Sequence, residues 1–168
     1  MQKIIVVHVD DENEVIEHIP DQIRLTFYLN HPEYEVGELT VTENGEHEII
    51  SCFELKCLDG AHCTVEYRIV EKLPSRDGWK DVDVAIFDYL RVHQAEALIP
   101  FDKTEILEVV ERLGRQKVFI FTGYPEEAGK ALRDHIEDEN FITKPGDALA
   151  IAEQIVVQII DSISQRTK

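Results

Sequence analysis

Basic residues are scarce in this chain of 168 residues. It has 17 Lys and Arg against 34 Asp and Glu, a formal net charge of −17 at pH 7. A charge of this sign and size repels a phosphate backbone, so direct binding of nucleic acid is disfavoured. No apolar run reaches the roughly 18 residues that a membrane-spanning helix needs, and residues 1–3 lead into a strand-like run with no signal peptide. We therefore expect a cytoplasmic protein without a membrane or nucleic-acid partner.

Cysteine is scarce as well, with three residues at positions 52, 57 and 63. An odd number of cysteines does not suggest a disulfide framework, and this fits a reducing compartment. Together with His62 the three thiols could form a zinc site, but they lack the short Cys-x-x-Cys spacing that sets tetrahedral geometry. We expect small residues on neighbouring strands instead.

Glycine and proline are few, at 8 and 6 residues, while 43% of the chain is apolar. This composition excludes a disordered chain and fits a single domain over residues 1–168. Four short apolar runs are rich in β-branched and aromatic residues, as parallel strands covered on both faces are. They lie at 4–9, 82–87, 118–121 and 141–142.

Helical spacing of apolar residues predicts four helices around these strands. They lie near 15–27, where Pro20 should kink or split the helix, and near 106–113, 125–136 and 147–163. Between residues 31 and 79 the pattern changes to β-branched, aromatic and acidic residues with turn signals. We predict an acidic β-rich insertion at 31–79, one strand of which joins the main sheet.

Polar residues follow the apolar runs directly. Asp10 and Asp11 follow the first run, Asp88 the second, Thr122 the third and Lys144 the last. Because the carboxyl ends of parallel strands meet at one edge of a sheet, these side chains should converge. Crowded carboxylates repel one another unless a hard cation such as Mg²⁺ lies between them, and a lysine and a hydroxyl opposite suit a phosphoryl group.

Four motifs make the chain resemble the receiver domain of two-component response regulators. The resemblance covers residues 3–30 and 80–163, through IIVVHVDDENE, DVDVAIFDYL, VFIFTGYPEE and FITKPGD. It implies an α/β, flavodoxin-like fold, a doubly wound parallel five-stranded sheet of order 2-1-3-4-5, with the insertion between the first helix and the third strand. It also implies a signalling phosphoprotein of a phosphorelay, which catalyses only its own phosphorylation and dephosphorylation.

The same resemblance implies a role for each polar residue. Asp88 is the phospho-acceptor, supplied by a histidine kinase or a phosphotransfer protein, and its modification switches a partner-binding surface. The residues implied to hold Mg²⁺ are Asp10, Asp11, Asp88 and the backbone carbonyl of Leu90. The residues implied to contact the phosphate and act as the switch are Thr122, Lys144 and Phe141. Tyr124, beside the phosphoryl group, would slow its hydrolysis.

Two other functions are compatible with parts of this pattern. A haloacid-dehalogenase-like phosphatase also uses a strand-end aspartate and Mg²⁺, but it needs a second aspartate where this chain has Leu90. A pseudo-receiver would bind a partner without phosphorylation, and the acidic insertion is compatible with that function. In either receiver interpretation, the last two helices offer a surface for a homodimer.

Overall fold

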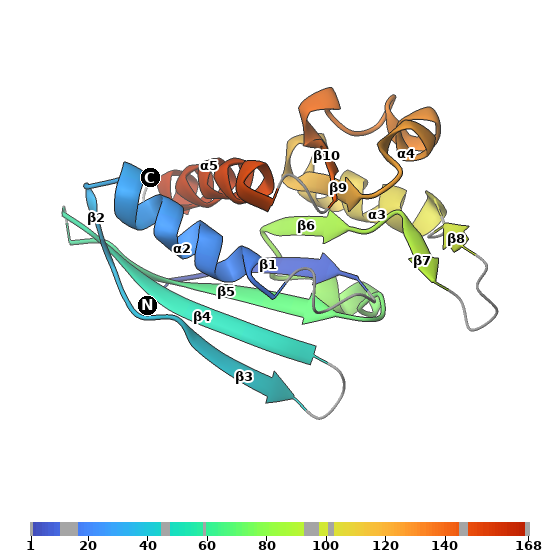
Figure 1. Cartoon of the computed structure of the whole chain (residues 1–168). Helices are drawn as coiled ribbons and strands as arrows, with labels where there is room; N and C mark the ends of the chain where they lie inside the picture. Colours follow the sequence, from blue (N-terminus) through green and yellow to red (C-terminus); the bar gives the residue numbers. More distant parts are fainter. Residues whose placement is uncertain are drawn as a thin grey trace.

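The centre of the molecule is an eight-stranded β-sheet with helices on both faces (Figure 1). The structure is a computed structural model that describes residues 2–10, 17–44, 48–58, 60–92, 98–100, 103–144 and 148–166. The order of the strands begins with β10 (Phe141–Thr143), β9 (Val118–Thr122), β6 (Val84–Phe87) and β1 (Gln2–Val9). It continues with β5 (His62–Val70), β4 (Glu48–Cys57) and β2 (Tyr34–Val36), and β3 (Thr40–Asn44) also pairs with β4.

The sheet is mixed, so the predicted five-stranded parallel flavodoxin-like sheet is wrong. β1 pairs in parallel with β5 and β6, β6 with β9, and β9 with β10. β4, however, is antiparallel to β5, β2 and β3. The physical reason is that the long β4–β5 hairpin uses the free edge of β1, after which the ladder continues outward through β4.

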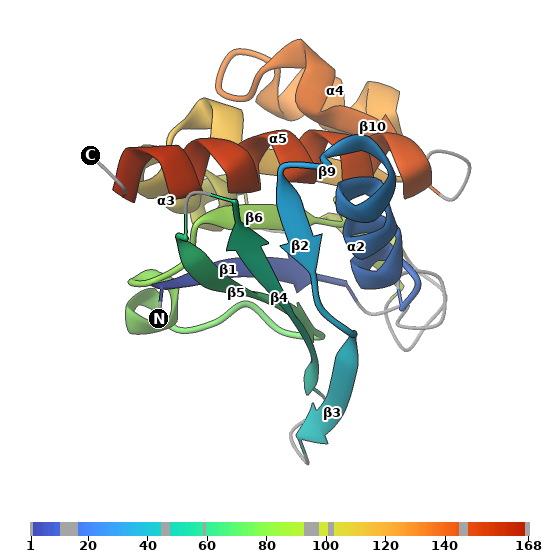
Figure 2. The ribbon, with the colours of Figure 1, turned by 90° about the vertical axis from the view of Figure 1, so that its left-hand side faces the viewer.

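Residues 31–79 therefore extend the main sheet, whereas only one of their strands was expected to join it. β5 runs alongside the whole of β1, from Gln2 opposite Cys63 to Val9 opposite Val70. Figure 2 shows β2, β3 and β4 continuing from the β1–β5 side of the sheet. A separate hairpin of β7 (Leu90–Val92) and β8 (Leu98–Pro100) lies beyond β6.

One face of the sheet is covered by α2 (Ile19–Asn30) and α5 (Ala148–Arg166). Pro20 stands in the first turn of α2, where its missing N–H is no loss. The predicted helix near 15–27 begins at Ile19 in the described part of the chain, and residues 15 and 16 lie outside the described residues. Isoleucines of α5 at 151, 155, 159 and 163 are buried against Ile4 and Val6 of β1 and their neighbours. Their spacing gives α5 one continuous apolar face.

The other face is covered by α3 (Lys103–Leu113), α4 (Pro125–Leu132) and the short turn η1 (Arg76–Trp79). Two further single turns, η2 (Arg115–Lys117) and η3 (Asp138–Asn140), precede β9 and β10. Gly114 ends α3 with a φ of 91°, a left-handed conformation that favours glycine. This face buries Ile5, Val7 and Val9, the alternate residues of β1, so β1 is apolar on both sides.

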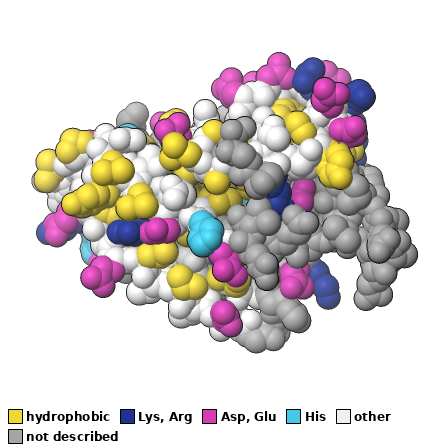
Figure 3. All heavy atoms as spheres, in the orientation of Figure 1, with side chains coloured by type: hydrophobic (Ala, Val, Ile, Leu, Met, Phe, Trp, Pro, Cys, Tyr) yellow, Lys and Arg dark blue, Asp and Glu magenta, His cyan; other side chains and the backbone are white. Residues whose placement is uncertain are grey.

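The surface differs between the two layers of helices. Figure 3 shows acidic and basic side chains gathered over α4 and η3, and hydrophobic side chains over α2. Tyr28 and Leu29, near the end of α2, are exposed, as are Leu149 and Val157 on α5. The homodimer through α4 and α5 stays a prediction. In the described part of the chain, no helix is both long enough and apolar enough to cross a membrane.

Candidate functional site

Four of the predicted site residues meet at one edge of the sheet. Asp10 follows β1, Asp88 follows β6, Thr122 ends β9 and Lys144 follows β10. The backbone ladder continues through three of these positions. The amide of Asp10 donates to the carbonyl of Val70, that of Asp88 to Val9 and that of Lys144 to Thr122, at 2.9–3.0 Å. Each side chain is thus placed by the sheet and not by a free loop.

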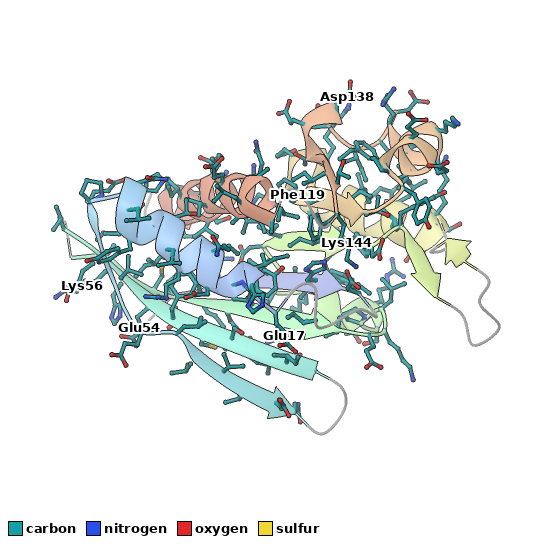
Figure 4. All side chains as sticks on the ribbon, in the orientation of Figure 1. Glu17, Glu54, Lys56, Phe119, Asp138 and Lys144 are labelled. Carbon is teal, nitrogen blue, oxygen red and sulfur yellow. The ribbon has the colours of Figure 1, made fainter. Side chains whose placement is uncertain are left out.

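The ammonium of Lys144 joins the two carboxylates. Its Nζ donates to both oxygens of Asp10, at 3.0 and 2.8 Å, and to Oδ2 of Asp88 at 3.2 Å. All three residues are buried, with Asp10 fully enclosed (Figure 4 labels Lys144 near the ends of the strands). A buried ammonium between two carboxylates is favourable only because its hydrogen bonds replace the lost solvation.

The two carboxylates have opposite electrostatic environments. Burial raises the pKa of Asp88 above its ordinary value; the charge of Asp10 adds to this, whereas Lys144 and a hydrogen bond with Thr122 oppose it. Burial also acts to raise the pKa of Asp10, but the neighbouring His8 ring and the Lys144 ammonium outweigh it, so this pKa is lowered. Asp10 is therefore the firmly ionised partner of Lys144, and Asp88 is the more basic carboxylate.

Thr122 lies beside Asp88 at the end of β9, and Tyr124 follows it by two residues. Thr122 is fully buried, and its Oγ1 accepts a hydrogen bond of 3.3 Å from the backbone amide of Tyr124. Tyr124 stands at the start of α4 with 42% of its surface exposed. Phe141 is half-buried and pairs with Ile120, two residues before Thr122 in β9. Since strand side chains alternate, Phe141 and Thr122 face the same side of the sheet.

Two of the predicted ligands for Mg²⁺ are incompletely described. Asp11 lies outside the described residues, and for Leu90 the structure gives the backbone at the start of β7. Among the residues that are described, no group of three or more His, Cys, Asp or Glu is placed to hold a metal ion. Asp10 and Asp88 share the Lys144 ammonium, and carboxylate oxygens are the kind of donor that Mg²⁺ prefers. A Mg²⁺ site here stays a prediction.

A buried pair behind Asp10 was not predicted as part of the site. His8 lies in β1 with its Nδ1 2.7 Å from the hydroxyl of Tyr67 in β5, and its Nε2 3.5 Å from Oδ2 of Asp10. The sequence places His8 two residues before Asp10 and so on the same side of β1, which was the available signal. The contribution of Tyr67 depends on the pairing of β5 with β1, which the sequence pattern did not predict.

Comparison with known proteins adds no family to these observations. No family model and no curated protein matches the chain. Among solved structures it is similar to Rv2714, a protein of unknown function from Mycobacterium tuberculosis, at 11% identity and a TM-score of 0.28, covering 98% of this chain and 78% of that one. It is also similar to JHP933 from Helicobacter pylori at 8% identity and a TM-score of 0.24, covering 95% and 96%. Similarity at this level carries no argument about fold or function.

Proposed function

We propose that this protein is a phospho-accepting switch, in which Asp88 takes a phosphoryl group from a histidine kinase or a phosphotransfer protein, as in receiver domains. One observation carries the proposal. The buried Lys144 ammonium contacts both Asp10 and Asp88 at the ends of neighbouring parallel strands, with the Thr122 hydroxyl beside Asp88. An acidic acceptor, a fixed cation and a hydroxyl donor are the groups that phosphoryl transfer to a carboxylate needs.

Asp88 is the nucleophile in this proposal. One of its carboxylate oxygens forms a bond to phosphorus while the bond from phosphorus to the donor's histidine nitrogen breaks, and that nitrogen keeps the electron pair. The raised pKa of Asp88 reflects a carboxylate that is more basic than usual, which favours attack once it is ionised. Lys144 is within reach of Asp88 to neutralise charge on the transferred oxygens.

The remaining groups position the phosphoryl group. The Thr122 hydroxyl donates a hydrogen bond to a phosphoryl oxygen in the modified state. Mg²⁺ held by Asp10, Asp11, Asp88 and the Leu90 carbonyl would supply further positive charge for those oxygens. Asp10 would hold this charge in place, because its own pKa is lowered and it stays ionised.

Modification of Asp88 would change the surface near β9 and β10. Phosphorylation adds charge beside Thr122, and a shift of Thr122 toward the phosphoryl group would leave space on the side of the sheet that Phe141 shares. Repacking of Phe141 would then alter what a protein partner contacts. The protein would act on itself alone and turn over no separate substrate.

Labelling with acetyl phosphate tests the proposal. Intact mass spectrometry of the purified chain with acetyl phosphate and Mg²⁺ should show one added phosphoryl group, which disappears without Mg²⁺. Asp88→Asn should abolish the adduct, and Asp81→Asn, an exposed carboxylate before the same strand, should leave it unchanged. An unlabelled wild type, beside a receiver domain that is labelled in the same tube, would reject the phospho-acceptor and favour a binding module that works without phosphorylation.

A further inference from the structure

The site has a second layer on the side of Asp10 away from Asp88. His8 is completely buried in β1, with the rings of Tyr67 and Phe121 each 6.0 Å from its own and steeply inclined to it. Its Nδ1 lies 2.7 Å from the Tyr67 hydroxyl, a normal hydrogen-bond distance. Tyr67 is completely buried as well. A polar pair in such a place is costly unless each polar atom has a partner.

The proton between Tyr67 and His8 has a definite location. Burial raises the pKa of Tyr67 well above its ordinary value of 10.0, so the phenol keeps its proton. On the other side of the ring, Nε2 faces the Asp10 carboxylate, which can only accept, so the geometry calls for a proton on Nε2. Nδ1 is then the acceptor, and the Tyr67 hydroxyl donates to it.

The other ring nitrogen supports this assignment. Nε2 is buried and has no hydrogen-bond partner among the described residues, but it lies 3.5 Å from Oδ2 of Asp10. A proton on Nε2 directs an N–H at a carboxylate, which is attractive. A proton on Nδ1 would instead direct the Nε2 lone pair at the same carboxylate, which is repulsive. Both contacts of the ring therefore favour the Nε2–H tautomer.

We propose that Tyr67 and His8 form a positioning element for Asp10, in which the Tyr67 hydroxyl holds His8 in the Nε2–H tautomer and that N–H fixes the Asp10 carboxylate. This inference rests on the proposed function, because it concerns how Asp10 serves the phosphoryl site. It assigns a positioning role to two buried residues that do not bind the phosphoryl group.

The arrangement gives Asp10 support on two sides. Lys144 contacts both of its oxygens, and His8 faces Oδ2 from the other side. Because His8 remains when Lys144 turns toward a phosphoryl group on Asp88, Asp10 keeps its orientation at the step when Lys144 is needed elsewhere.

Nitrogen NMR of the full chain tests the geometry without any phosphorylation. Long-range proton–nitrogen spectra of the wild type should show the His8 proton on Nε2 and none on Nδ1. Tyr67→Phe should produce a mixture of tautomers, and Asp10→Asn should shift the Nε2–H resonance. Tyr34→Phe is the matched control, since Tyr34 packs against the same hydrophobic core from β2. A His8 proton on Nδ1 in the wild type would overturn the proposal. An Nε2–H resonance that does not shift in Asp10→Asn would overturn it as well.

The Mg²⁺ dependence of acetyl phosphate labelling tests the role. Tyr67→Phe and His8→Leu should raise the half-saturating Mg²⁺ concentration by about 10- to 100-fold, as loss of an outer-shell partner does, with a smaller change in the maximal rate. Tyr34→Phe should match the wild type. Half-saturation unchanged in a folded Tyr67→Phe protein would show that the pair serves packing alone. If the wild type is not labelled, the phospho-acceptor proposal fails. The nitrogen spectra then still test whether Tyr67 and His8 position Asp10.

Discussion

The Nζ of Lys144 lies 2.8 Å from Oδ2 of Asp10 and 3.2 Å from Oδ2 of Asp88. Lys144 follows β10, and its ammonium links the residues that follow β1 and β6. The three residues are far apart in the chain and meet because parallel strands end at the same edge. The relationship has consequences for stability as well as for chemistry, because each member is buried.

Removal of Lys144 should destabilise the fold. Lys144→Met leaves two buried carboxylates without their shared cation, which should lower the free energy of unfolding by about 3–5 kcal/mol at pH 7. Urea denaturation measures this difference. Lys130→Met, on the exposed side of α4, is the control and should change little. A loss for Lys144→Met of less than about 1 kcal/mol, the size typical of exposed pairs, would mean that the ion pair is not a buried one.

Asp88→Asn should stabilise the protein at neutral pH. Since the pKa of Asp88 is raised in the folded state, the folded chain holds this proton more tightly than the unfolded chain, and stability falls as the pH rises through that window. The variant avoids this loss. Its advantage should therefore be largest at pH 7 and vanish below the ordinary carboxyl value of 3.8. Urea midpoints of wild type and variant from pH 3 to 8 give the comparison; a variant less stable at pH 7 would contradict it.

Asp10→Asn should have the opposite pH dependence. The pKa of Asp10 is lowered in the folded state, so its contribution to stability is present above 3.8 and is lost as the pH falls through the lowered value. The variant should be less stable than the wild type at pH 7, and the two should converge in acid. The same urea series measures this, and a pH-independent difference would indicate that lost packing, not charge, is the cause.

The hydroxyl of Thr122 should be required for efficient labelling. Thr122→Val keeps the shape of the side chain but loses a hydrogen bond to a charged group, which should slow labelling of Asp88 roughly tenfold. Thr122→Ser keeps the hydroxyl and should stay close to the wild type. Initial rates with acetyl phosphate at fixed Mg²⁺ distinguish the two, and equal slowing in both variants would point to the methyl group instead.

Tyr124 should lengthen the lifetime of the phosphorylated state. Its backbone amide is bound to Thr122, and its ring stands at the start of α4, where it would limit the approach of water to phospho-Asp88. Tyr124→Ala should therefore lose the phosphoryl group faster, which intact mass over time after removal of acetyl phosphate would show. Slower decay in the variant than in the wild type would contradict this shielding role.

Local sequence patterns predicted the apolar strands and the residues that follow them. Asp10, Asp88, Thr122 and Lys144 were found because each stands at the end of a short apolar run, and the structure brings them to one edge. The extent of the sheet was not predictable in this way. Alternation in residues 34–70 indicates strands, but it does not say that β5 pairs with β1 or that β4 carries the ladder further outward.

The same distinction separates the two layers of the site. Asp88 and Lys144 carry a local signal, a polar residue directly after a strand. Tyr67 carries none, since it looks like any inward-facing aromatic residue of a strand. Its contact with His8 exists only because a register between distant segments sets β5 beside β1.

Chemical location of the phosphoryl group tests the central claim most directly. Borohydride reduces an aspartyl phosphate to homoserine, so peptide mass spectrometry of the reduced chain, after treatment with acetyl phosphate and Mg²⁺, reads the modified position. We predict homoserine at position 88 and at no other carboxylate, with none in Asp88→Asn. Homoserine at another aspartate, or its absence throughout a correctly folded wild type, would contradict the account.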